Sequence, residues 1–160
     1  MSERIVVLEI SGLEALHLAG IVGQFRDLLS DSRAGEDPAV ERLLPDAYPD
    51  DLAASREFRR LTGEDLLERR SQDVATVLHT LGLDGADLDP ESDPDATIAV
   101  ALGEAEALAW MRTLSALRLV MATRLGIQTD DDHDPEDPRY GVYDWIGYRL
   151  DGLVAALDRA

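Results

Sequence analysis

The 160-residue sequence contains no cysteine, no lysine and no asparagine. Without cysteine the chain has no disulfides, no thiolate metal ligands and no cysteine nucleophile. All fifteen basic residues are arginines, and they face 33 aspartates and glutamates, which gives a formal net charge of −18. Such a surface repels phosphate backbones and anionic lipids, so we expect neither nucleic acid nor a membrane as a partner. A protein with a basic surface is compatible with this charge.

Long apolar runs are also missing. No stretch approaches the ~18 residues that a membrane-spanning helix needs, and the start, MSERIVVLEI, lacks the basic and apolar regions of a signal peptide. We therefore expect a cytoplasmic protein, with one domain over residues 1–160. The three histidines, His17, His79 and His133, are far apart in sequence, so no metal or cofactor is predicted from them. No nucleophile elbow, Gly-rich phosphate loop or metalloprotease motif is present, which leaves no catalytic residue to name.

Two short apolar segments, residues 4–10 and 97–102, predict β-strands. A helix follows each of them. The first helix begins at the capping-box spacing Ser11-x-x-Glu14 and extends to about Ser30, and the second covers residues 104–125. Because a single strand needs a partner, we expect the two strands to pair. The two strand–helix segments superpose at an offset of 92 residues, which indicates either an internal duplication or a coincidence of Leu- and Ala-rich composition.

The rest of the chain is mainly helical in pattern. Asp37-Pro38 predicts a helix start, and Asp50 or Asp51 can cap another. Thr62-Gly63 predicts a break between two helices. The expected helices cover residues 38–44, 52–61, 62–81 and 142–157. The predicted fold class is therefore α+β and predominantly helical, with five to six helices packed around a central helix at about 104–125 and a small two-stranded sheet, 4–10 with 97–102.

The predicted central helix is apolar on most sides, which is typical of a buried helix. No acidic residue occurs between Ala107 and Thr129, and Arg112, Arg118 and Arg124 are six residues apart. At ~100° per residue they point in directions about 120° apart, so they do not form a clamp for one anion.

Arg118 lies at the edge of the apolar stripe, where a charge needs a partner. Asp144, Glu14 and Asp27 are the candidate carboxylates. The alternative is that Arg118 binds an anionic ligand, with a neighbouring carboxylate, in a polar pocket.

Two loops, residues 84–95 and 129–138, are strongly acidic. In the second, Asp130, Asp132 and Asp134 alternate as in a calcium loop. Pro135 stands where such a loop requires glycine, and Gly141 stands where it requires the bidentate glutamate. We therefore predict no metal site and interpret both loops as solvated.

The last predicted helix contains the densest aromatic cluster, YDWIGYRLDGLV. Gly147 and Gly152 lower helix propensity, which indicates that a close contact favours them. Trp145 and Tyr148 fall outside the inward stripe of this helix. They either pack beneath the 127–141 loop or form an exposed anchor for a partner protein or a second copy of the chain.

Three segments together resemble an uncharacterised actinobacterial family, domain of unknown function 2017. They are LLPDAYPDDLAASREFRRLTGEDL, WMRTLSALRLVMATRLGI and VYDWIGYRLDGLV. One departure is that Ser115 and Ala116 stand where the family commonly has an Asn-Asp pair. The resemblance implies no activity or catalytic residue. It implies that the gene is commonly found beside that of the Clp protease adaptor, which delivers substrates with destabilising amino termini.

Two hypotheses for function follow. The favoured one is a non-enzymatic, acidic interaction or regulatory module, connected with Clp proteolysis, whose partner is a basic protein. A purely structural homodimer subunit is a further, separate possibility. The alternative is a small-molecule binding protein or enzyme that uses Arg118 with a neighbouring carboxylate.

Overall fold

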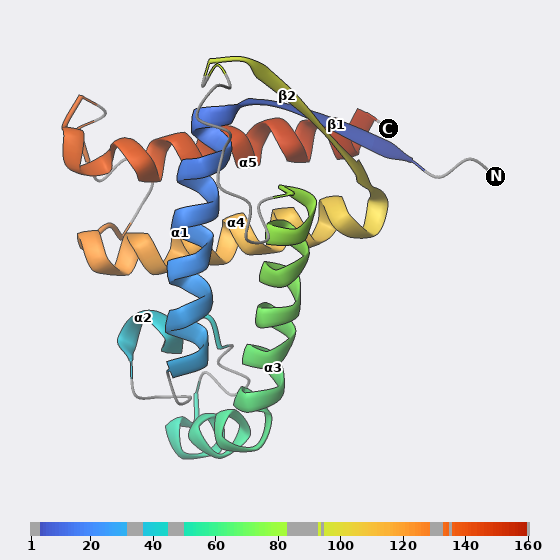
Figure 1. Ribbon diagram of the computed structural model, residues 1–160. Coiled ribbons are helices and arrows are strands. Elements are labelled where there is room, and N and C mark those ends of the chain that lie inside the picture. The colour runs from blue at the N-terminus through green and yellow to red at the C-terminus, as the bar shows by residue number, and fades with distance from the viewer. Residues whose placement is uncertain are drawn as a thin grey trace.

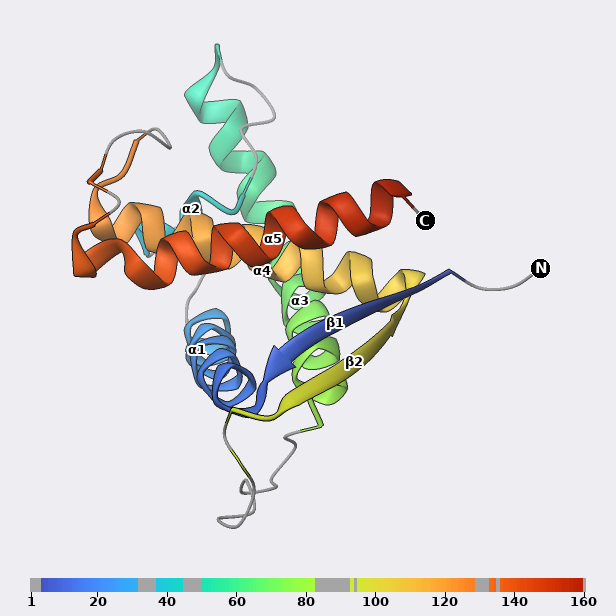
Figure 2. The same cartoon turned by 90° about the horizontal axis from the view of Figure 1, so that it is seen from above.

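The computed structural model describes residues 4–31, 37–44, 50–82, 93, 95–128, 133–134 and 136–159. The elements in these ranges are β1 (Ile5–Ser11), α1 (Gly12–Asp31), α2 (Pro38–Glu41), α3 (Leu52–Thr80), β2 (Thr97–Gly103), α4 (Glu104–Leu125), the 3-10 helix η1 (Pro138–Tyr140) and α5 (Gly141–Arg159). The predicted class, predominantly helical α+β with a small two-stranded sheet, is confirmed. Helices α4 and α5 lie side by side, and α1 and the later part of α3 cross them steeply (Figures 1 and 2).

The two strands form an antiparallel ribbon in which Leu8 faces Val100 and Ile5 faces Gly103. The predicted pairing is therefore confirmed, with each strand ending one residue later than expected. Side chains alternate between the two faces of the ribbon, as strand geometry requires. The inner face contributes Val6, Ile10, Val100 and Leu102 to the core, while Ile5 and Val7 are exposed on the outer face.

The strand–helix units β1–α1 and β2–α4 correspond at the predicted offset. Ile5 and Thr97 begin the strands, and Gly12 and Glu104 begin the helices. The ribbon thus has a local two-fold relation about its central pair, Leu8 and Val100. This confirms that the strands and the helix starts of the two units correspond at this offset. Common ancestry of the two units stays a prediction, because similar elements can arise from similar composition.

Helix α3 corrects the predicted break at Thr62-Gly63. One continuous helix covers Leu52–Thr80 where two were expected. The Thr62 hydroxyl donates a hydrogen bond to the Phe58 carbonyl one turn earlier, at 2.8 Å. The side chain is therefore bonded within the helix and does not favour an extended backbone that would end it. The helix bends where its teal first part gives way to green, and the first part projects from the body (Figures 1 and 2). A threonine bonded in this way, followed by glycine, is a known cause of helix bending.

Helix α4 has the predicted bounds and contributes the largest share of buried residues. They are Ala107, Ala109, Trp110, Thr113, Leu114, Ala116, Leu117, Val120 and Ala122. The helix ends at Gly126, whose φ of 74° lies in the left-handed region that glycine adopts without strain. One strip of α4 is open to solvent at Arg112 and Ser115. The central position is confirmed, most sides of α4 carry buried residues as expected, and this strip is the side left open.

A single large apolar cluster joins all the major elements. Its large and most enclosed members come from the sheet and from α1, α2, α3, α4 and α5: Ile10, Val22, Val40, Val74, Val77, Leu102, Trp110, Leu114 and Ile146. Within the described residues, no helix combines the length and apolar content that crossing a membrane requires.

Candidate functional site

The three arginines of α4 diverge as predicted and contact three different elements. The Arg112 guanidinium donates to both carboxylate oxygens of Asp73 in α3, at 2.9 and 3.0 Å. Arg124 donates to Asp37, the N-cap of α2, at 2.8 Å. The Ala39 N–H and the Arg124 guanidinium both bond to Asp37 and lower its pKa, against the opposing effect of burial. Both of these ion pairs therefore hold α4 to its neighbouring helices.

Arg118 lies against α5. Its Cζ atom is 4.3 Å from the centre of the Tyr143 ring, a cation–π contact. The carboxylates predicted as partners of Arg118 lie with other cations. Glu14 binds Arg149, Asp144 binds His133, and Asp27 is 3.9 Å from Arg26.

Gly147 allows the Arg118 guanidinium to approach the α5 backbone. A Cβ atom at this position would lie 3.0 Å from Nε and 3.2 Å from Nη2 of Arg118. The predicted close contact is therefore confirmed at Gly147. At Gly152 it is wrong, because a Cβ atom there would meet nothing within 4 Å.

This difference gives a test within one helix. Gly152→Ala is expected to stabilise the protein by about 0.5–1 kcal/mol, because alanine has the higher helix propensity. Gly147→Ala is expected to lose that gain and to be neutral or destabilising, since the new methyl group displaces the guanidinium. Urea unfolding followed by far-UV circular dichroism measures both. Equal stabilisation by the two substitutions would contradict the contact.

A pocket of about 320 Å³ reaches Arg118. Its polar lining comes from Arg42, Ser115, Arg118 and Gln128, and its apolar lining includes Leu119 and Leu150. No carboxylate among the described residues lines this pocket. The described residues therefore supply the cation of the predicted ligand site without the carboxylate that the enzyme hypothesis requires.

The predicted site residue Asp144 bonds to a buried histidine. His133 Nε2 lies 2.7 Å from Asp144 Oδ1, and the imidazole ring packs against Tyr140 and Tyr143, with centroids at 4.7 and 5.5 Å. This contact attaches the segment before η1 to the first turn of α5. Asp144 thus has His133 as its structural partner, whereas Trp145 bonds to Glu14.

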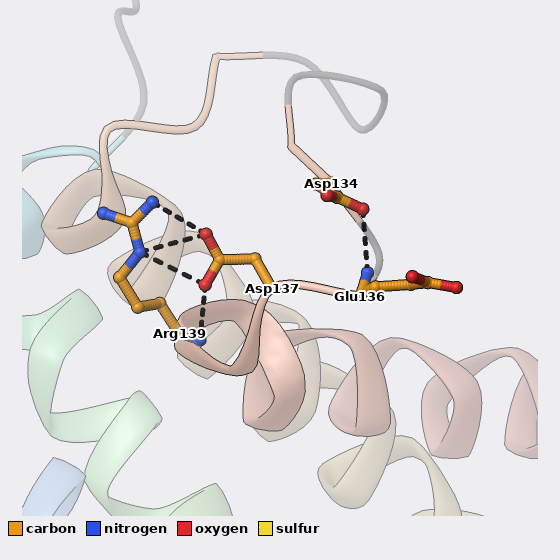
Figure 3. Close-up of polar contacts among 4 residues, drawn as sticks. All are labelled: Asp134, Glu136, Asp137 and Arg139. Carbon is orange, nitrogen blue, oxygen red and sulfur yellow. Dashed lines mark hydrogen bonds and ion pairs between the residues drawn. The ribbon is translucent and has the colours of Figure 1, made fainter.

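The acids around η1 bond to their own segment (Figure 3). Asp134 accepts a hydrogen bond from the Glu136 N–H at 3.0 Å. Asp137 accepts the Arg139 N–H at 3.0 Å and binds its guanidinium at 2.7 Å, and the Arg139 bonds lower the pKa of Asp137. Most of the acidic loop 84–95, and residues 129–132 and 135 of the second loop, lie outside the described residues. In the part that is described, no three His, Asp or Glu side chains are grouped to hold a metal ion.

The aromatic residues Trp145 and Tyr148 do not form one exposed anchor. The Trp145 indole is partly buried and donates from Nε1 to Glu14 Oε2 at 3.2 Å. Tyr148 is 71% exposed, with its ring 5.9 Å from the Arg149 guanidinium carbon. Trp145 therefore packs toward α1, and Tyr148 alone projects into solvent.

Sequence reasoning missed the contact between Glu14 and Arg149. Arg149 donates to Glu14 Oε2 from Nε at 3.1 Å and from Nη2 at 2.5 Å, and to the Glu9 carbonyl at 3.0 Å. The capping box predicted at Ser11 is half formed, because Ser11 Oγ accepts the Glu14 N–H at 3.1 Å while the Glu14 carboxylate turns to α5. An Arg in α5, three residues after the apolar stripe position Ile146, gives no signal of a partner so distant in sequence.

An apolar groove lies between α1 and the α4–α5 pair. It combines a hollow of about 520 Å³ at Trp145 with one of about 400 Å³ at Met121, and both are lined by Ile21 and Val142. We call this the α1–α5 groove and define it by Ile21, Leu28, Met121, Val142 and Trp145. Arg124 and Arg139 stand on its rim, each bonded to an aspartate.

The comparison with protein families agrees with the resemblance of the three segments. The model of a family described as a domain of unknown function (DUF2017) matches residues 2–157. The chain belongs to this family. No curated protein and no solved structure matches the chain.

Two of the three segments that resemble the family contribute residues to the pockets described above. Two of them correspond to α4 and α5, and the first leads from the end of α2 into α3. Of the neighbouring pair Ser115 and Ala116, Ser115 is exposed on the open strip of α4 and Ala116 is buried.

Proposed function

We propose that the chain is a non-enzymatic, cytoplasmic interaction module that binds a protein partner in the α1–α5 groove. The observation that carries this proposal is the continuity of the two apolar hollows through Ile21 and Val142. An apolar groove of this kind suits an amphipathic helix or an extended segment that inserts apolar side chains. Val142, which is 42% exposed, and the partly buried Trp145 offer apolar surface that a partner can cover.

The charge of the molecule favours a basic partner. The arginines on the groove rim are neutralised locally, because Arg124 binds Asp37 and Arg139 binds Asp137. The rim therefore does not offset the formal charge of −18. Long-range attraction toward this charge accelerates association with a positively charged protein and weakens as salt is added.

We further propose that the partner belongs to Clp-dependent proteolysis, either as the protease or as its adaptor. The gene neighbourhood that accompanies the family resemblance supports this choice. The absence of an acid–base pair among the described residues around Arg118 favours a regulatory role over a catalytic one.

The test uses purified Clp adaptor and Clp ATPase, titrated with the wild-type chain and two variants by calorimetry. Val142→Glu places a charge in the α1–α5 groove and is expected to weaken binding by about tenfold or more. Leu61→Glu is the matched control, since Leu61 is 67% exposed on α3 outside the groove, and it is expected to bind as the wild type does.

Two outcomes would contradict the proposal. One is equal binding by the Val142→Glu and Leu61→Glu variants, which would place the interface elsewhere. The other is no binding to either Clp component, combined with a dimer in sedimentation that only Val142→Glu dissociates. That result would identify a second copy of the chain as the occupant of the groove.

A further inference from the structure

The open strip of α4 bears a second groove, on the face opposite the α1–α5 groove. A hollow of about 750 Å³ between α3 and α4 is lined by Arg69, Arg70, Asp73, Arg112 and Ser115. Ser115 also lines the pocket of about 320 Å³ that contains Arg42 and Arg118. The two hollows therefore meet at this exposed serine. We call the joined feature the arginine groove and define it by Arg42, Arg69, Arg70, Arg112 and Arg118.

The helical spacing explains how diverging arginines come to line one groove. Arg112 and Arg118 point about 120° apart, and Ser115 lies midway between them at ~60° from each. Because α4 is uncovered at Ser115, the two arginines mark opposite edges of the open strip. Helix α3 adds two arginines on the Arg112 side, and Arg42 adds one on the Arg118 side.

The charge of this groove is opposite to that of the molecule. Asp73 is the only carboxylate among its described lining residues, and both of its oxygens are occupied by Arg112. Within the described chain, Arg42, Arg69 and Arg70 take part in no ion pair. The sequence has 15 arginines against 33 acids, so five arginines with one carboxylate in the described lining reverse the charge balance of the chain.

Several of these guanidiniums are already held in place. Arg42 Nη1 donates to Thr123 Oγ1 at 2.9 Å, and Arg70 Nη1 donates to the Arg112 carbonyl at 3.4 Å. Arg118 rests on the Tyr143 ring. Side chains that are ordered before binding lose less conformational entropy when a ligand arrives.

We propose that the arginine groove binds an acidic peptide segment in which carboxylates are interspersed with apolar residues. Guanidinium forks match carboxylates in geometry. Leu66, Met111, Leu119 and Leu150 line the same hollows and accept apolar side chains. The strip from Arg112 to Arg118 rises ~9 Å along the helix, which accommodates a few residues of extended chain. A nucleic acid is disfavoured, because its phosphates continue beyond the groove onto an acidic surface.

The probe is a fluorescein-labelled peptide of four Glu-Glu-Leu repeats, followed by fluorescence anisotropy at about 50 and about 200 mM NaCl. A peptide of four Gln-Gln-Leu repeats and a single-stranded RNA of twelve nucleotides are the comparison ligands. We expect the acidic peptide to bind, the neutral peptide to bind far more weakly, and the higher salt to weaken binding.

Two double variants with the same net charge separate the groove from the general charge. Arg69→Gln with Arg70→Gln is expected to weaken peptide binding by about tenfold or more. Arg26→Gln with Arg159→Gln, whose arginines lie on α1 and at the end of α5 outside the groove, is expected to leave it nearly unchanged. Arg42→Gln is a second groove variant, and far-UV circular dichroism confirms that each variant is folded.

The proposal is overturned if both double variants weaken binding alike, or if the neutral peptide binds as well as the acidic one. Tighter binding of the RNA would assign the groove to nucleic acid instead. Absence of binding at about 1 mM peptide in the lower salt also overturns it. Because Val142 and the α1–α5 groove are unchanged in these variants, the result is independent of the Clp experiment.

Discussion

Replacing Trp110 with alanine is expected to lower the free energy of unfolding by about 3–5 kcal/mol. Trp110 is only 1% exposed, although it is the largest side chain in the core. Its neighbours around one small cavity come from β1, α1 and α5, and include Ile10, Leu18 and Ile146. Removing the indole therefore opens a void that several elements share, and the loss of dispersion contacts adds to the loss of apolar burial.

The indole N–H of Trp110 also joins α4 to α3. It donates to Thr80 Oγ1 at 2.7 Å, and the single proton of this hydroxyl is shared between the Thr76 and Val77 carbonyls, each at 3.0 Å. Trp110→Phe keeps most of the ring volume and removes this bond, so a smaller loss of about 1–2 kcal/mol is expected. Urea unfolding followed by circular dichroism compares the two variants.

Tyr148→Ala is the control for the Trp110 series. Tyr148 is an aromatic residue on α5 that is 71% exposed, so its truncation is expected to change stability by less than about 0.5 kcal/mol. A loss below about 1.5 kcal/mol for Trp110→Ala, or a loss as large for Tyr148→Ala, would contradict the position of Trp110 at the centre of the core.

The features that sequence predicted well are local. Asp37 and Asp51 cap their helices through backbone N–H groups at 2.9 and 3.0 Å, as expected of aspartate before a helix. The bounds of α4 follow from an apolar segment between a strand and Gly126. These signals depend on only a few neighbouring residues, so they can be recognised without knowledge of the tertiary packing.

Tertiary placement was predicted less well. The break expected at Thr62-Gly63 is a bend in one helix, because tertiary context overrides weak helix propensity. The divergence of Arg112 and Arg118 follows from helical spacing. Their position on one open strip does not, since it depends on α3 and α5 leaving Ser115 uncovered. The partner of Glu14 could not be identified for the same reason: it lies in α5, and several arginines were equally compatible with the pattern.

Replacing Glu14 with alanine is expected to destabilise the protein by about 1–2 kcal/mol, which is a large effect for a residue that is not in the core. Its Oε2 atom accepts three hydrogen bonds, two from Arg149 and one from Trp145. The Glu14 and Arg149 side chains are 33% and 22% exposed, so solvent screens the pair only partly. The expected loss of stability is therefore smaller than for a fully buried ion pair. The substitution leaves Arg149 Nε and Nη2 and the Trp145 N–H without this acceptor, while Arg149 Nη1 keeps its bond to the Glu9 carbonyl.

The matched control is Glu57→Ala on α3. Glu57 also binds an arginine in two places, Arg60 at 2.6 and 3.2 Å, but this pair is exposed and lies within one helix. Its loss is expected to leave the unfolding midpoint nearly unchanged. A double-mutant cycle of Glu14→Ala with Arg149→Ala then isolates the coupling. A contact that joins α1 and β1 to α5 must lower stability when it is removed. If neither Glu14→Ala nor Glu57→Ala lowers the free energy of unfolding, the Glu14–Arg149 pair does not hold these elements together.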